Sequence, residues 1–119
     1  MITAADQNQK TEPLVDYMKM LIAYVRSDRP DLTNRQMALL MVVYLLPGPH
    51  TVRGLALTLH CRKPVVTRML NALGAMGYLR RQKDHTDLRS LFVVYTPAGV
   101  AFLEEFTELA ERARHHSGL

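Results

Sequence analysis

Positively charged side chains are concentrated in one part of this 119-residue chain. Residues 53–89 hold eight Lys or Arg against two Asp, a net charge of +6. Residues 1–52 balance five basic against five acidic side chains, and residues 90–119 set two Arg against four Glu. A basic stretch with few acids is typical of a surface that binds the phosphates of nucleic acid. The alternative is an ordinary solvated face.

A helix that begins around residues 62–64 and ends at Gly77 is predicted inside this basic stretch. Its apolar residues recur at helical spacing and predict one buried stripe, made of Val66, Met69, Leu70, Leu73 and Met76. The opposite arc carries basic, polar and small residues, namely Lys63, Val65, Thr67, Arg68, Asn71 and Ala72. One side of this helix therefore suits a core, and the other suits a partner.

Short elements are predicted on both sides of this helix. Thr51 can cap a helix over residues 52–60, in which Leu57 points outward. Two short strands are expected around residues 78–79 and 91–95, joined by the polar loop 82–90. Thr96 and Pro97 then open a last helix. The order is a helix-turn-helix followed by a two-stranded wing.

The N-terminal part predicts two more helices. A capping box from Thr33 to Gln36 opens one of them. The other is expected to begin at Thr11 and Pro13, after a flexible arm over residues 1–10. Apolar residues cover most of its circumference, which predicts a second packing partner and hence a homodimer. A helix sunk deeply in its own core is the alternative.

These elements predict a mainly α fold with a small β-hairpin wing (α+β), a winged helix-turn-helix of about five helices. We expect residues 11–119 to form a single winged-helix domain. In it, the first and last helices support dimerisation and residues 51–96 form the DNA-binding unit.

Enzymatic and metal chemistry lack the residue patterns that they require. The sequence shows no Gly-rich phosphate loop, nucleophile elbow or paired catalytic carboxylates, so we expect no enzyme. The five His show no ligand spacing beyond the adjacent His115 and His116, so we expect neither a metal nor a cofactor. Without a signal peptide or an apolar run of roughly 18 residues, a cytoplasmic location is expected.

The single cysteine, Cys61, excludes an internal disulfide framework and agrees with a reducing compartment. It precedes Arg62 and Lys63 near the start of the basic helix, a setting in which thiols can be reactive. A redox switch there would act directly on DNA binding. The interpretation that we favour is a buried, inert thiol.

The run from Leu32 to Gly99 resembles the winged helix-turn-helix regulators of the MarR type, which are bacterial repressors and activators. The matching pieces are Leu32-Thr33 with Gln36, Leu55-Ala56 with Leu59, Val66-Thr67-Arg68 followed by Leu70, Leu73 and Gly77, then Arg81, Asp87-x-Arg89-Ser90 and Thr96-x-x-Gly99. Their order and spacing over roughly 70 residues make the match specific. The resemblance implies sequence-specific binding of double-stranded DNA, with a recognition helix in the major groove and a wing near the minor groove.

Physical chemistry agrees with the implied roles. Arg68 is the first candidate for reading a base, because Arg can bond guanine O6 and N7 in a bidentate way. Thr67 suits a base edge or a thymine methyl group, and Asn71 suits a base or a phosphate. The resemblance places Arg89 at the minor groove, with Asp87 holding its guanidinium. Lys63 suits a backbone phosphate. The alternatives of phosphate partner or solvated charge stay open for five further residues, namely Arg53, Arg62, Arg80, Arg81 and Lys83.

Three residues depart from what a DNA-binding unit of this type should carry. Arg62 stands where a small capping residue is usual, which predicts a poorly capped recognition helix. Leu57 and Leu88 are apolar where a DNA-facing unit should be polar, and this favours the alternative of a winged-helix protein-interaction adaptor without DNA reading. A third hypothesis is a sensor that binds a small aromatic effector between the helical dimer base and the DNA-binding lobe.

Overall fold

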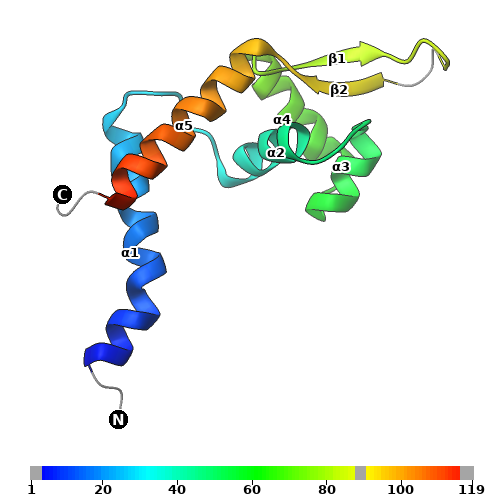
Figure 1. Cartoon of the computed structure of the whole chain (residues 1–119). Coiled ribbons are helices and arrows are strands. Elements are labelled where there is room, and N and C mark those ends of the chain that lie inside the picture. The colour runs from blue at the N-terminus through cyan, green and yellow to red at the C-terminus, as the bar shows by residue number, and fades with distance from the viewer. Residues whose placement is uncertain (1–3, 88–90, 116–119) are drawn as a thin grey trace. The chain divides into compact units, whose positions relative to one another are not determined.

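The computed structural model describes residues 4–87 and 91–115, with side chains from residue 11 onward. The described elements are, in chain order, α1 (Ala4–Arg26), α2 (Asn34–Leu45), α3 (Val52–Leu59), α4 (Lys63–Ala75), β1 (Leu79–Lys83), β2 (Leu91–Tyr95) and α5 (Pro97–His115) (Figure 1). They agree with the mainly α prediction. The chain divides into two compact units, residues 32–103 and residues 1–31 with 104–119.

The core of unit 32–103 lies where α2, α3 and α4 pack together on one side of the hairpin (Figure 1). Its fully buried side chains come from all three helices and are Leu39, Leu40, Leu55, Val66 and Leu73. In each helix, these residues belong to the apolar side that faces the other two helices. The remaining side of each helix is left for solvent or a partner.

Side-chain caps define the starts of α2 and α3 as expected. The Gln36 N–H donates to Thr33 Oγ1 at 3.1 Å while the Thr33 N–H donates to Gln36 Oε1 at 3.0 Å, which completes the predicted capping box. The Gly54 N–H donates to Thr51 Oγ1 at 3.0 Å. At α4 the N-cap is Arg62, which forms no side-chain cap, as the sequence predicts.

The hairpin pairs β1 with β2 in antiparallel register, from Leu79 opposite Tyr95 to Lys83 opposite Leu91. Leu79 and Val93 are buried and fix the hairpin to the helices. His50 adds an isolated bridge, because the Val93 N–H donates to its carbonyl oxygen at 2.8 Å. The segment between α2 and α3 is thereby tied to the sheet.

One junction connects α4, β1 and α5. Gly77 ends the helical stretch at a φ of 81°, which glycine adopts without steric cost. The Thr96 hydroxyl donates to the Gly77 carbonyl oxygen at 2.5 Å and accepts the Gly99 N–H at 3.0 Å. A Cβ on Gly99 would overlap the Tyr78 carbonyl oxygen, so this approach requires glycine. The junction sets where the hairpin leaves the helices.

Unit 1–31 with 104–119 is held by contacts between α1 and the later turns of α5. The rings of Tyr24 and Phe106 meet edge to face, with 5.7 Å between their centroids. Arg29 and Glu105 form an ion pair, and the Tyr24 hydroxyl donates to the Pro30 carbonyl oxygen. These contacts place the loop after α1 against α5.

Two details of the helices correct the sequence predictions. Helix α1 begins at Ala4 and contains Pro13, whereas a start at Thr11 after a loose arm over 1–10 was expected. The first residues of the helix, AADQNQK, are mostly good helix formers. They lack an apolar repeat, but such a repeat indicates that one side of a helix is buried, and a helix can form without it. Met76, predicted in the buried stripe, is 38% exposed because α4 ends at Ala75 and its repeat stops there.

Candidate nucleic-acid interface

The outer side of α4 is an exposed polar and basic surface. Lys63, Thr67, Arg68 and Asn71 are exposed, while Val66, Met69, Leu70 and Leu73 are buried on the opposite side. The sequence of α4 contains no Asp or Glu, so no carboxylate within the helix neutralises its cations. Arg62 is exposed at the N-cap and adds a further charge. This division of the helix agrees with the sequence prediction.

A direct hydrogen bond connects this helix to the hairpin. Arg81 in β1 donates from Nη2 to Asn71 Oδ1 across 3.1 Å. Both residues were candidate DNA contacts, and the structure brings their polar groups together. The contact between them could not be predicted from their separation of ten positions.

A groove of about 450 Å³ runs beside Arg68, between the start of α2 and α4. Its lining residues are Thr33, Asn34, Arg35, Gln36, Val65, Arg68 and Met69. Arg35 was not among the predicted site residues, because it lies outside the basic stretch 53–89 and only the fold brings it near α4. The described lining contains two guanidinium groups and no Asp or Glu. This composition suits a phosphate.

The hairpin tip carries charged residues beside a hydrogen-bonded turn. The Thr86 hydroxyl and N–H donate to Asp84 Oδ1 at 2.6 and 2.9 Å. These bonds, the hydroxyl first, lower the pKa of the Asp84 carboxyl. Lys83 and Asp87 are exposed. Leu88 and Arg89 lie outside the described residues, so the predicted pair of Asp87 and Arg89 stays a prediction.

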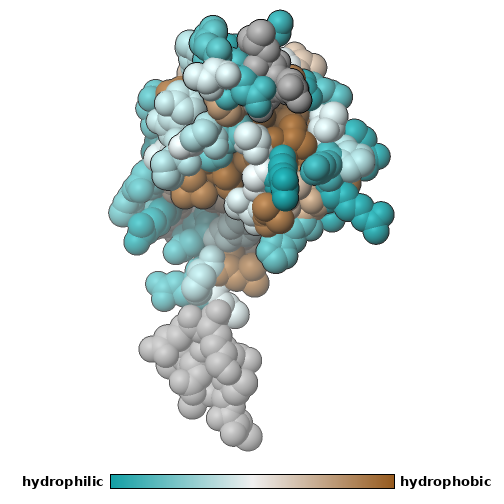
Figure 2. Space-filling view, turned by 90° about the vertical axis from the view of Figure 1, so that its right-hand side faces the viewer, coloured by the Kyte–Doolittle hydropathy of each residue, from teal (hydrophilic) through white to brown (hydrophobic). Residues whose placement is uncertain are grey.

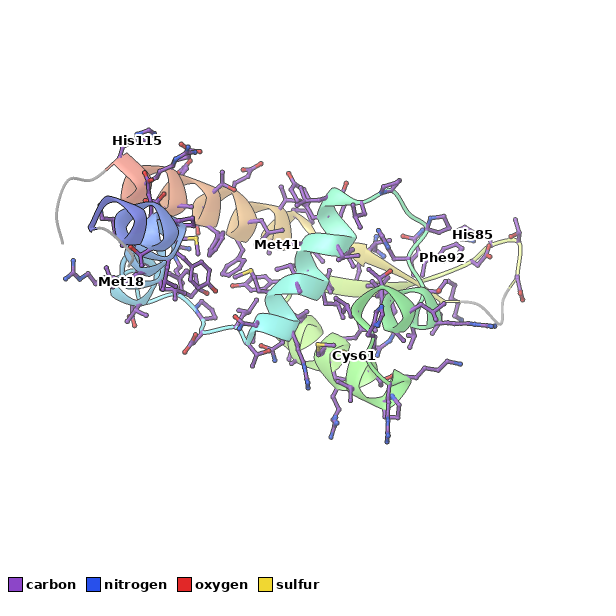
Figure 3. The ribbon with its side chains drawn as sticks, turned by 90° about the horizontal axis from the view of Figure 1, so that it is seen from below. Met18, Met41, Cys61, His85, Phe92 and His115 are labelled. Carbon is purple, nitrogen blue, oxygen red and sulfur yellow. The ribbon has the colours of Figure 1, made fainter. Side chains whose placement is uncertain are left out.

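Cys61 lies at the junction of α3 and α4 (Figure 3). It is half-buried, and its Sγ is 3.5 Å from the Leu59 carbonyl oxygen. The favoured inert thiol and the alternative redox switch both stay predictions. Within residues 4–87 and 91–115, no three potential ligands of the His, Cys, Asp or Glu type gather at a point.

Apolar side chains reach the surface of unit 32–103 away from α4. The face in Figure 2 shows hydrophobic residues in brown among hydrophilic ones in teal. Leu57, predicted to point outward, is 70% exposed. A groove of about 650 Å³ runs between the end of α2, the following loop and β2, and its lining includes Tyr44, Arg80, Phe92 and Tyr95.

Solved structures of similar fold are bacterial proteins. The transcriptional regulator Tm0710 from Thermotoga maritima is 27% identical, with a TM-score of 0.70 over 87% of this chain and 70% of that one. A mutant of MepR from S. aureus bound to an oligodeoxyribonucleotide is 21% identical, with a TM-score of 0.78 over 92% and 78%. RV1404 from Mycobacterium tuberculosis is 20% identical, with a TM-score of 0.73 over 91% and 71%.

The sequence comparisons identify the family. No curated protein sequence matches the chain. The MarR family model matches residues 32–91, which is half of the chain and includes the whole of α2, α3, α4 and β1. Among the helices that the structure describes, none has both the length and the apolar character of a membrane span.

Members of the MarR family are transcriptional regulators and not enzymes. The chain belongs to the MarR family of winged-helix, DNA-binding transcription regulators.

Proposed function

We propose that the protein binds double-stranded DNA at specific sequences, with α4 in the major groove and the hairpin near the minor groove. The observation that carries this proposal is the exposed side of α4, which presents Lys63, Thr67, Arg68 and Asn71 without an acidic residue in the helix. A major groove admits one α-helix, and the N-terminal residues of that helix meet the base edges. The oligonucleotide bound to the MepR mutant supports the same use of this fold.

The candidate contacts of α4, of its N-cap and of the wing have proposed tasks. Arg68 reads guanine through O6 and N7, and Thr67 contacts a base edge or a thymine methyl group. Phosphates on one side of Arg68 are bound by Arg62 and Lys63, and the groove shared with Arg35 takes another. In the wing, Lys83 binds a phosphate, and Arg89 enters the minor groove with its guanidinium held by Asp87.

The proposed active form is a homodimer built through α1. Six large apolar side chains of this helix are exposed, namely Leu14, Val15, Tyr17, Met18, Leu21 and Val25. Such a surface is unusual for a monomer and suits burial against a second copy. Two recognition helices would then meet two half-sites of one operator.

We infer that the groove at the end of α2 takes a small aromatic acid as effector. Tyr44, Phe92 and Tyr95 offer ring faces, and Arg80 offers a cation for an acidic group. The groove lies entirely within unit 32–103. A concentration-dependent rise in melting temperature with benzoate-type acids, absent in Phe92→Ala, tests this. Equal rises in both proteins would contradict it.

The experiment that tests the function is selection of bound fragments from the native genome, followed by binding measurements with the Arg68→Ala variant. On the selected site the variant is expected to lose about 1–3 kcal/mol, while its binding to unrelated DNA changes little. Arg114→Ala, which removes an exposed cation from α5, is the control and should bind like the wild type. Equal losses on both DNAs would show that Arg68 contacts only the backbone.

A protein-interaction adaptor is the second candidate function. The observation that favours it is the exposure of an apolar side chain on α3, because Leu57 is 70% exposed. Failure to shift any genomic fragment at low salt, together with a protein partner lost in Leu57→Ser, would support the adaptor. A selected DNA site that Leu57→Ser still binds would exclude it.

A further inference from the structure

The hydrogen bond between Arg81 and Asn71 fixes which end of the Asn71 amide is free. A guanidinium group carries five N–H donors and no acceptor. The atom that faces Arg81 Nη2 at 3.1 Å must therefore be the carbonyl oxygen of Asn71. The amide nitrogen, with two donors, is the end that remains for another partner.

We propose that Arg81 is a positioning residue that turns Asn71 into a hydrogen-bond donor and thereby sets its base preference. This inference rests on the proposed function, because it assumes that α4 enters the major groove. Asn71 is exposed one helical turn after Thr67, on the same side of α4 as Lys63 and Thr67. It belongs to the surface that faces the base edges.

The consequence for recognition follows from the chemistry of the base edges. An unconstrained Asn pairs with adenine by accepting from N6 and donating to N7. Here the Asn71 oxygen already accepts a hydrogen bond from Arg81. An adenine amino group would have to donate to the second lone pair of the same oxygen, which would place its partly positive hydrogens beside the guanidinium. Guanine presents two acceptors, O6 and N7, and no donor at this position. The Asn71 contact thus selects guanine and rejects adenine.

The strand that carries Arg81 also supplies a matched control. Successive side chains of a β-strand point to opposite faces, so Arg80 and Arg81 leave β1 on different sides. Arg80 lines the groove with the end of α2 and β2, and Arg81 reaches α4. Both residues are exposed, and both carry the same charge. Replacing either one removes one cation, but only Arg81→Ala releases the Asn71 amide.

The test is selection from randomised duplex DNA, with sequencing of the bound pool, for the wild type and four variants. The variants are Asn71→Ala, Arg81→Ala, Arg80→Ala and the double variant Asn71→Ala with Arg81→Ala. In the wild type, one base position should prefer guanine over adenine by roughly five-fold or more and lose this preference in Asn71→Ala. Arg81→Ala should shift that position toward adenine. Arg80→Ala removes a candidate phosphate contact and can lower the affinity for all sequences, but it should leave the base preference at that position unchanged. In the Asn71→Ala background, Arg81→Ala should change nothing at that position.

The outcomes separate this inference from the proposed function. Binding that weakens on all sequences in Arg81→Ala, with an unchanged base preference, would make Arg81 a phosphate contact and overturn the inference alone. A wild-type preference for adenine at the position that depends on Asn71, or no such position, would also overturn it. If the wild type selects no DNA at any salt concentration, the proposed function itself fails. Melting temperatures of all variants establish that each one is folded.

Discussion

Hydrogen bonds orient single polar groups of the proposed DNA interface in the free protein. Arg81 orients Asn71, and Thr86 holds the Asp84 carboxylate at the hairpin tip. An oriented group loses less conformational freedom on binding than a free one, so more of its contact energy appears as affinity. Within residues 11–87 and 91–115, the exposed cations of α4, Lys63 and Arg68, form no such hydrogen bond or ion pair. Their contribution is expected to depend more strongly on salt.

The Asp84 turn gives a prediction on pH. Hydrogen bonds from Thr86 lower the pKa of the Asp84 carboxyl, so Thr86→Val should raise it toward the ordinary value of an aspartate. The sign follows from linkage: the stabilisation of the turn is present above the unfolded pKa and is lost as the pH falls through the lower folded pKa. Titration of the Asp84 carboxyl carbon by NMR measures the shift. Identical titration curves for Thr86→Val and the wild type would contradict it.

The sequence predicted which residues of α4 face the core, and it could not predict their partners. Helical periodicity alone separates Val66 and Leu70 from Thr67 and Arg68, because each turn repeats the same side. The contact of Arg81 with Asn71 and the groove shared with Arg35 depend on tertiary packing. No local pattern reports the position of one element against another. Single-residue roles were thus more accessible to sequence analysis than pairs.

Element boundaries depend on a few backbone positions. Capping residues Thr33, Thr51 and Thr96 were all predicted, because a cap needs only its own neighbours. The start of α1 was misplaced, since Pro13 is common at helix starts but here lies inside the helix. The close approach of Gly99 to Tyr78 was also invisible in the sequence, although Gly99 itself belongs to the family pattern.

The Gly99 contact predicts a strong effect on stability. Gly99→Ala should lower the free energy of unfolding by about 1–3 kcal/mol, because its Cβ must displace the Tyr78 backbone in a packed junction. Gly74→Ala is the control, since its Cβ would lie 3.8 Å from its nearest neighbour, the Leu79 carbonyl oxygen, inside α4. It should stabilise by about 0.5–1 kcal/mol. Urea unfolding of both variants measures the difference, and equal midpoints would refute the argument.

Large apolar side chains of α1 are exposed on the single chain, and this exposure is the basis of the proposed dimer. Leu14 and Val25 of α1 are 67% and 74% exposed. Basic charge lies mainly in residues 53–89, while the apolar helix α1 belongs to the other unit. The proposed DNA recognition and the proposed self-association thus involve different units of one chain.

A pair of leucine substitutions tests the dimer. Leu14→Asp places a charge on the exposed side of α1 and should yield monomers in analytical ultracentrifugation, with weaker binding to the selected site. Leu45→Asp introduces the same charge at an equally exposed leucine, 68% against 67%, at the end of α2. It should leave the dimer intact. Dissociation by both variants, or by neither, would remove α1 from the interface.

The most direct test of DNA recognition is the salt dependence of binding to the selected operator. If about six phosphates are engaged by the cations of α4, the α2 groove and the hairpin, the affinity should fall roughly 10³-fold or more between 50 and 200 mM salt. The logarithm of the binding constant should decrease linearly with the logarithm of the salt concentration. A flat dependence over this range would contradict a phosphate-binding interface and, with it, the proposed role of the basic surface.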